Sequence, residues 1–247
     1  MKKLLLLIIC AALAAVFTTG CVSVNLAPGL AGGGISGKGD AETYTWDVGE
    51  ITEINVTLYC DIDYYSAPSD KVTLEIQPNL RDYVVVEESG GVLTVRSTRN
   101  INWSGKAPVL TVSTPALSRL SLAGAGAFTA HDTITADSFT LRMDGAGSGS
   151  ADLDVSDLSI TMAGAGSFKL SGKADTAKFE MNGAGSVDAL SLDTRDATVN
   201  LSGVGTVKLS CSDNLRIDAG GLGTVEYKGS PSLDLNRGGM VTVTKVG

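Results

Sequence analysis

The stretch LSLAGAGAF, which runs from Leu120 to Phe128, decides the fold of this protein. It begins with the alternation of apolar and polar residues that is typical of a β-strand, and then places Gly-Ala-Gly where two further side chains are due. The same interruption returns about every twenty residues. Its first glycines are Gly124, Gly145, Gly164, Gly183, Gly203 and Gly221, with Arg237 in the seventh slot, at intervals of 21, 19, 19, 20, 18 and 16 residues.

Apolar residues keep a fixed offset from these anchors. They stand four and two residues before each anchor and four and six residues after it, for example Ile160 and Phe168 on either side of Gly164. The residues between them are mostly polar, so the period is two and the elements are strands, not helices. Only one unit is weak, because Gly149 and Ala151 take its two following apolar positions.

Both glycines of each Gly-x-Gly fall on the inward parity of the alternation. Glycine has no Cβ and tolerates positive φ, so the chain can bend there or run close to a neighbouring backbone. Aligned repeats of this kind predict a stacked corner. The predicted structural turn glycines are Gly124, Gly126, Gly145, Gly147, Gly164, Gly166, Gly183, Gly185, Gly203, Gly205, Gly221 and Gly223.

The repeats are too short to bury an apolar face alone and become stable by stacking. We therefore predict an all-β fold, a parallel β-solenoid that is most specifically a right-handed β-helix with about 20 residues per coil. Successive coils should lie about 4.8 Å apart. A β-propeller or a β-sandwich is the competing fold, although propeller blades need about 40 residues each.

The first twenty residues have the pattern of a secretory signal peptide. Lys2 and Lys3 precede an apolar run from Leu4 to Phe17, and small residues follow as far as Gly20. The run is shorter than the roughly 20 residues of a membrane-spanning helix. A permanent anchor helix is the alternative. Within the run, Cys10 is expected to leave with the peptide.

The segment Phe17-Thr18-Thr19-Gly20-Cys21 resembles a bacterial lipobox, although Thr18 stands where that pattern prefers an aliphatic residue. The resemblance implies signal cleavage after Gly20 and lipidation of Cys21. Because Val22 is not Asp, it also implies the outer membrane as destination if the host is diderm. Ordinary cleavage that leaves a free thiol at Cys21 is the alternative.

The mature chain divides into a tether and one domain. Residues 21–40 are rich in Gly and small residues and predict a lipid-anchored flexible tether. Residues 41–247 are expected to form a single β-helical domain, in which 118–245 hold the regular repeats. Residues 41–117 predict irregular early coils or a cap, since an open last coil would leave an unpaired edge.

The block DYVVVEESGGVLTVRS (82–97), followed by APVLTVSTPALSRLSLAGAG (107–126) and repeated GAGS units, resembles the putative auto-transporter adhesin head GIN domain family. This resemblance implies an exported, β-helical domain of bacterial envelope lipoproteins. It brings no catalytic residues. The sequence departs from the family late, where Val204 and Leu222 replace the small central residue of Gly-x-Gly.

Charge and motifs exclude several kinds of site. Removal of Lys2 and Lys3 from the 19 basic residues leaves 17 against 27 acidic ones, a balance of about −10 that argues against nucleic acid binding. No phosphate loop is expected at 145–149, since no lysine and helix follow. The acids Asp61 and Asp63 are read as solvated, and Asp218 and Asp234 as occupants of the same slot in consecutive coils that attract a cation weakly.

Catalytic, cofactor-binding and metal-binding residues are therefore not assigned, and no cofactor is expected. The one histidine, His131, stands in a predicted turn without a nucleophile motif. An exported pair such as Cys60 and Cys211 suggests a disulfide, but a linear stack would hold them several coils apart, so we predict two free thiols. Seven of the eight Tyr and Trp residues precede Ser104, which marks that end as a ligand face or as a well-filled cap.

These patterns predict a non-enzymatic cell-envelope lipoprotein whose β-helical domain is a display or binding surface, for example in adhesion. Its expected partners are the membrane, through the lipid anchor, and a glycan or an envelope or extracellular protein. Two alternatives remain open: a polysaccharide-acting β-helix enzyme, such as a lyase or hydrolase, and a self-assembling structural envelope protein.

Overall fold

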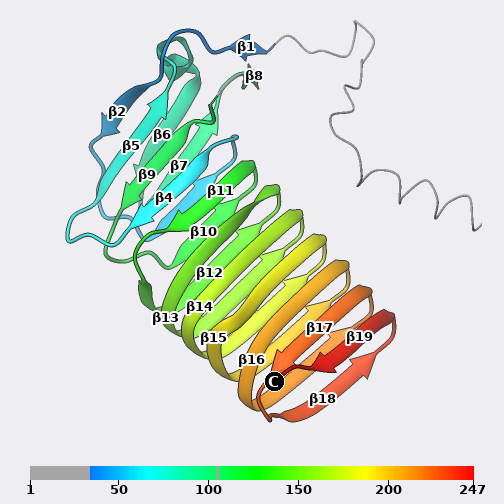
Figure 1. Ribbon diagram of the computed structural model, residues 1–247. Helices are drawn as coiled ribbons and strands as arrows, with labels where there is room; N and C mark the ends of the chain where they lie inside the picture. The colour runs from blue at the N-terminus through cyan, green and yellow to red at the C-terminus, as the bar shows by residue number, and fades with distance from the viewer. Residues whose placement is uncertain (1–33, 104–105) are drawn as a thin grey trace, which may run out of the picture. The chain divides into compact units, whose positions relative to one another are not determined.

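The computed structural model describes residues 34–103 and 106–247, and its compact unit spans Gly34–Gly247. About 70% of the described residues are in strands and 3% in a helix, and the strands are arranged as a parallel β-solenoid of about seven turns with about 19 residues per turn (Figure 1). The predicted fold class is confirmed.

The regular coils come from the second half of the chain. Each strand pairs in parallel with the equivalent strand one turn later, so that the strands lie in successive rungs (Figure 1). The strands are β10 (Arg119–Leu122), β11 (Ala125–Ala130), β12 (Ile134–Met143), β13 (Ala146–Met162), β14 (Ala165–Met181), β15 (Ala184–Leu201), β16 (Val204–Ala219), β17 (Leu222–Lys228), β18 (Ser232–Arg237) and β19 (Met240–Lys245).

Inward side chains stack in ladders that form one continuous core. One ladder, completely buried, consists of Leu141, Ile160, Phe179, Val199 and Ile217. Packing explains why the repeat that contains Gly149 lacks a large apolar residue there. A Cβ at Gly149 would lie 2.3 Å from the ring of Phe168 in the next coil. Gly149 therefore makes room for a large neighbour, and the missing side chain leaves no gap.

The Gly-x-Gly corner depends on close backbone contact between coils. The carbonyl oxygen of Gly145 accepts a hydrogen bond from the N–H of Ala165 at 2.9 Å, and a Cβ at Gly164 would lie 1.8 Å from that same oxygen. Corresponding distances at Gly183, Gly203 and Gly221 are 1.9, 2.0 and 2.1 Å. A side chain here would occupy the place of the carbonyl that the ladder needs.

The seventh slot belongs to Gly239, not to Arg237 as the spacing suggested. Leu222 pairs with Met240, and a Cβ at Gly239 would lie 2.1 Å from the Gly221 oxygen. Arg237 pairs with Ala219, two positions before the corner. The apolar residues of the last repeat favour an anchor at Arg237, whereas the backbone contact at the corner fixes it two residues later.

The N-terminal part contains one coil and a cap folded back onto it. Strands β3 (Glu53–Val56) and β4 (Asp61–Tyr65) pair in parallel with β10 and β11 and form the first coil. The chain then leaves the stack and returns in β7 (Val92–Ser97) and β9 (Val109–Ser113), which add a rung on the outer side of β3 and β4. This rung precedes the first coil in space but follows it in sequence.

Antiparallel strands complete this cap. Strand β6 (Val84–Ser89) pairs with β7, β5 (Lys71–Ile76) pairs with β9, and β2 (Glu42–Trp46) pairs with β5. A 3-10 helix, η1 (Pro78–Tyr83), joins β5 to β6. Strand β1 (Ile35–Ser36), which lies in the stretch predicted as tether, pairs with β8 (Ile101–Asn102).

The two cysteines of the described chain are free and buried. Cys60 lies in the first coil, where a Cβ at Gly126 would meet its carbonyl oxygen at 1.9 Å, and Cys211 lies far along the stack in β16. Burial raises the pKa of the Cys60 thiol to about 12. This thiol therefore stays protonated and behaves as a small core side chain.

We expect Gly221→Ala to destabilise the domain by about 1–3 kcal/mol or more, because its methyl group would collide with the Gly203 carbonyl. Gly220→Ala is the matched control, since a Cβ there meets nothing within 4 Å. Its effect should stay within about 0.5 kcal/mol. Urea unfolding of both variants checks this, and equal stabilities would refute the role assigned to the corner.

Candidate functional site

An open groove of about 890 Å³ runs across successive coils at their other bend, away from the Gly-x-Gly corner. It is lined by residues of β12, β13, β14, β15 and β16 and by Gly229 and Ser230 after β17. Because each coil contributes equivalent positions, the lining is periodic along the stack. We call this feature the lateral groove.

The floor of the lateral groove is one ladder of small side chains. Register places Ala136 beside Val155, then Ala174, Thr194 and Cys211 in the following coils. All except Ala136 are buried. The floor therefore presents little side-chain surface to the groove, and the polar residues on either side of it stand higher.

Two polar ladders form its walls. One consists of Thr135, Asp154, Lys173, Asp193 and Ser210, paired in register from coil to coil. The other stands at the bend itself and contains the exposed residues Asp137, Ser156, Asp175, Arg195 and Ser212. The walls therefore offer closely spaced hydroxyl and carboxylate groups and two cations.

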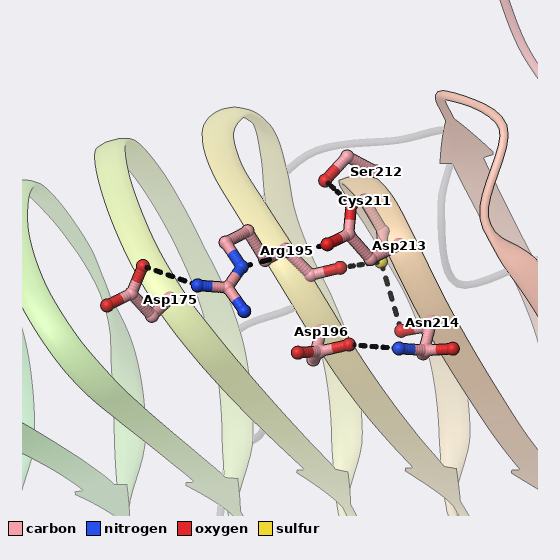
Figure 2. Close-up of polar contacts among 7 residues, drawn as sticks. All are labelled: Asp175, Arg195, Asp196, Cys211, Ser212, Asp213 and Asn214. Atoms are coloured by element: carbon pink, nitrogen blue, oxygen red, sulfur yellow. Dashed lines mark hydrogen bonds and ion pairs between the residues drawn. The ribbon is translucent and has the colours of Figure 1, made fainter.

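Figure 2 shows how side chains join neighbouring coils at this bend. The Arg195 guanidinium lies 3.9 Å from Asp175 in one coil and 3.7 Å from Asp213 in the next. One residue further along the same two coils, Asn214 Nδ2 donates a hydrogen bond to Asp196 at 2.6 Å. The Arg195 ion pairs are exposed and weak individually, so the guanidinium remains accessible for a ligand.

The Cys211 thiol is part of the floor and is satisfied by the backbone. Its Sγ lies 3.2 Å from both the Arg195 and the Asn214 carbonyl oxygens (Figure 2). Burial raises the pKa of this thiol. It is thus a neutral, hydrogen-bonded group and not an activated nucleophile.

The lateral groove has an excess of negative charge. Four carboxylates, those of Asp137, Asp154, Asp175 and Asp193, line it together with Lys173 and Arg195. Lys173 Nζ pairs with Asp154 at 3.2 Å. In the part of the chain that the structure describes, Asp137 and Asp193 make no ion pair. An anionic ligand would therefore be repelled, and a neutral or cationic one accepted.

Comparison with known proteins places the chain in a family. A family model described as "Putative auto-transporter adhesin, head GIN domain" matches residues 50–231. The chain belongs to this family. Among curated proteins, none matches it. The match covers the first coil, the cap except for β1 and β2, and the whole lateral groove, which runs from Thr135 to Ser230.

Solved structures share the fold of this GIN domain at low sequence identity. A putative adhesin from Bacteroides fragilis has a TM-score of 0.80 and 20% identity over 86% of this chain and 100% of its own. A putative lipid binding protein from Parabacteroides distasonis has a TM-score of 0.65 and 20% identity over 86% and 99%. A putative adhesin from Parabacteroides merdae has a TM-score of 0.62 and 17% identity over 86% and 99%.

Other candidate residues of the GIN domain make contacts between its first two coils. Asp61 Oδ1 accepts a hydrogen bond from the N–H of Ala127 at 2.8 Å. Asp63 Oδ1 lies 2.8 Å from His131 Nε2, and the ring of Tyr65 stacks on the His131 ring at 4.6 Å. Each acid is thus partly exposed and also contacts the next coil, Asp61 through a backbone N–H and Asp63 through the His131 ring, which the sequence did not predict.

Asp218 and Asp234 do not share a slot, contrary to the sequence alignment. Asp218 pairs with Asn236, and Asp234 pairs with Arg216, because the last repeat is shifted by two residues. Arg216 reaches both acids, at 2.9 Å and 3.2 Å. It lowers the pKa of Asp218 through their hydrogen bond. Across residues 34–103 and 106–247, no three His, Cys, Asp or Glu side chains are grouped to hold a metal.

The early aromatic residues do not converge on the lateral groove. Tyr44 and Trp46 lie beside Arg81, whose guanidinium is 5.4 and 5.8 Å from their ring centroids. Tyr64 is buried and its hydroxyl donates to the Thr114 carbonyl.

The lateral groove is not among the features predicted from the sequence. A signal for it is nevertheless present, because a triplet of one small and two polar residues recurs midway between the glycine anchors: Ala136-Asp137-Ser138, Val155-Ser156-Asp157, Ala174-Asp175-Thr176 and Thr194-Arg195-Asp196.

The predicted signal peptide, the cleavage site at Gly20 and the lipidation site at Cys21 lie outside the described residues. Within the described part, no helix is long and apolar enough to cross a membrane.

We expect Arg195→Ala to change the free energy of unfolding by less than about 1 kcal/mol, because its ion pairs are long and mostly exposed. Arg142→Ala, which removes an exposed arginine outside the lateral groove, is the matched control. Urea denaturation measures both. A loss of several kcal/mol for Arg195→Ala alone would show that this residue holds the coils together instead of serving the surface.

Proposed function

We propose that this protein is a non-enzymatic, lipid-anchored protein of the bacterial cell envelope, and that its lateral groove binds a ligand in adhesion. The observation that carries the proposal is the groove itself: a long, periodic depression with a floor of small side chains and walls of exposed polar groups. Family membership supports the adhesive role, because the family's description names an adhesin.

The envelope location is supported by the sequence. The signal-like N-terminus, the lipobox-like residues before Cys21 and the Gly-rich stretch at 21–40 together suit export followed by anchoring in a membrane. In a diderm host the anchor would lie in the outer membrane. A tether of this composition would let the solenoid reach away from the lipid.

The groove favours an extended, neutral or positively charged polymer, either a glycan or a segment of an envelope or extracellular protein. Its hydroxyls, carboxylates and two cations supply donors and acceptors in every coil, which suits a ligand with repeated polar groups. Cleavage of polysaccharide is the competing hypothesis, because the groove carries four carboxylates, the kind of group that glycosidases use.

Binding should depend on the walls of the groove. We expect the double variant Asp137→Lys/Asp193→Lys, and separately Ser156→Trp, to lose most binding to the glycans or proteins that the native chain captures on arrays. The first reverses the charge of the two carboxylates without ion pairs, and the second places a large side chain in the depression. Ser150→Trp, at an exposed serine elsewhere on β13, is the matched control.

Unchanged binding by both groove variants would place the binding surface elsewhere, and the absence of any captured ligand would remove the binding role. Turnover of a glycan by the native chain would instead favour the enzymatic alternative.

Lipidation is tested separately. We expect the native chain to incorporate a labelled fatty acid during bacterial growth and Cys21→Ala to lose that label, because the thiol is the acceptor. The control is Cys10→Ala, which should keep the label, since Cys10 stands within the apolar run. Label retained in Cys21→Ala would exclude this anchor while leaving the groove proposal untouched.

A further inference from the structure

The last rung of the solenoid, formed by β18 and β19, has an open edge. In the part of the chain that the structure describes, β18 pairs only with β16 and β19 only with β17 (Figure 1). Their outer backbone N–H and C=O groups therefore face away from the stack without strand partners. Only another strand edge can pair with such a row along its whole length.

Exposed apolar side chains gather at this same end. The described chain exposes seven large hydrophobic side chains, and five of them belong to the final coils: Val204, Leu222, Leu233, Leu235 and Met240. Leu233 and Leu235 are 40% and 37% exposed and occupy inward positions of β18, next to Leu215 and Ile217 of the preceding coil. The core therefore continues into β18 and β19, and no residue of the described chain covers it on the outer side.

A third observation concerns the corner. The central residue of Gly-x-Gly is alanine in four successive coils and then becomes Val204 and Leu222. Met240 holds the same register position in the last corner, where Val241 replaces the second glycine. Met240 is 78% exposed. The apolar side chains at this position thus become larger toward the open rung. Their exposure to water is unfavourable in free energy unless another surface covers them.

The last rungs of two copies of the chain can pair with each other by two-fold symmetry. β18 and β19 are each six residues long and meet at Gly238 and Gly239. A two-fold axis through Gly238 lays β18 antiparallel on β19 of a second copy, and the same pairing recurs on the other side.

This register keeps like side chains together. Leu235 lies opposite Val241 of the second copy and Leu233 opposite its Val243, all at inward positions, so the two cores become continuous. Among outward residues, Asp234 lies opposite Thr242. No two like charges face each other directly, because Arg237 meets Gly239, which has no side chain.

Head-to-tail stacking onto the cap is less well matched. On one face the cap ends two strands beyond the first coil, at β6, and on the other it ends three strands beyond, at β2. These two edges are staggered, so a level rung could pair with only one of them. We infer that two copies of this chain associate through β18 and β19 into a closed dimer, independently of the ligand in the lateral groove.

Cysteine cross-linking of the full chain tests the register. Gly238→Cys places a thiol on the two-fold axis, so oxidation should link two copies readily. Gly220→Cys is the matched control: it is the equivalent corner position one coil earlier, and a Cβ at either glycine meets nothing within 4 Å. Its two copies would be about 14 Å apart, three strand spacings, which exceeds the roughly 7 Å reach of a disulfide.

Sedimentation over a micromolar concentration series tests the association itself. The native chain should pass from monomer to dimer and no further. Leu233→Lys/Leu235→Lys should abolish the dimer with an unchanged circular dichroism spectrum, because both leucines are already partly exposed. Val204→Lys, at an exposed apolar residue two coils away, should leave it intact.

Several results would overturn the inference: a monomer throughout the series, polymers that grow without limit, a dimer that survives in the folded double variant, or equal cross-linking of Gly238→Cys and Gly220→Cys. The native chain sets the background from its own cysteines. If the double variant does not fold, the cross-linking comparison decides alone.

Discussion

The stack depends on one close approach, in which a glycine of each coil from Gly124 onward lies against a backbone carbonyl of the coil before it. The Gly164 position illustrates this: the carbonyl of Gly145 accepts the ladder hydrogen bond from Ala165 and occupies the space where a side chain at 164 would begin. The corner can therefore turn tightly and keep its ladder only if that side chain is missing. Since the coils from Gly124 to Gly239 all make this contact, the register of one coil is passed to the next.

That common register explains how a repetitive core produces a specific surface. Once the corners align, positions halfway round the coil align as well, and a single choice of residue size is repeated along the stack. Ala136, Val155, Ala174 and Thr194 share one position along the stack, and their small or buried side chains form the floor of one continuous depression. The lateral groove is thus a consequence of the same stacking that stabilises the fold, and its charge is set by residues that the core does not constrain.

The sequence predicts the repeating part because local rules decide it. Alternation specifies the strands, and the missing side chains at Gly145 or Gly183 mark the corner without knowledge of the fold. The cap is different, since β7 and β9 join the stack out of sequence order and no local pattern records which strand they will pair with. The position of the last corner at Gly239 was not predicted for a related reason. The apolar residues of the last repeat favour one alignment, whereas the backbone contact requires another. The lateral groove was not predicted because its lining residues come from several coils and become neighbours only when those coils stack.

The two ends of the stack meet the same physical problem differently. Any solenoid must end, and an end exposes both the core and a row of backbone groups. At the N-terminal end the chain adds a rung from β7 and β9 and covers it with antiparallel strands, so Ile54 and Ile62 of the first coil are almost fully buried. At β18 and β19 the described chain adds no such cover, yet it places leucines inside the rung and enlarges the corner residue to methionine. For a monomer in water, polar side chains on this rung would have a lower free-energy cost of exposure. Apolar residues retained on a level, self-complementary rung are what an end built for another strand edge requires.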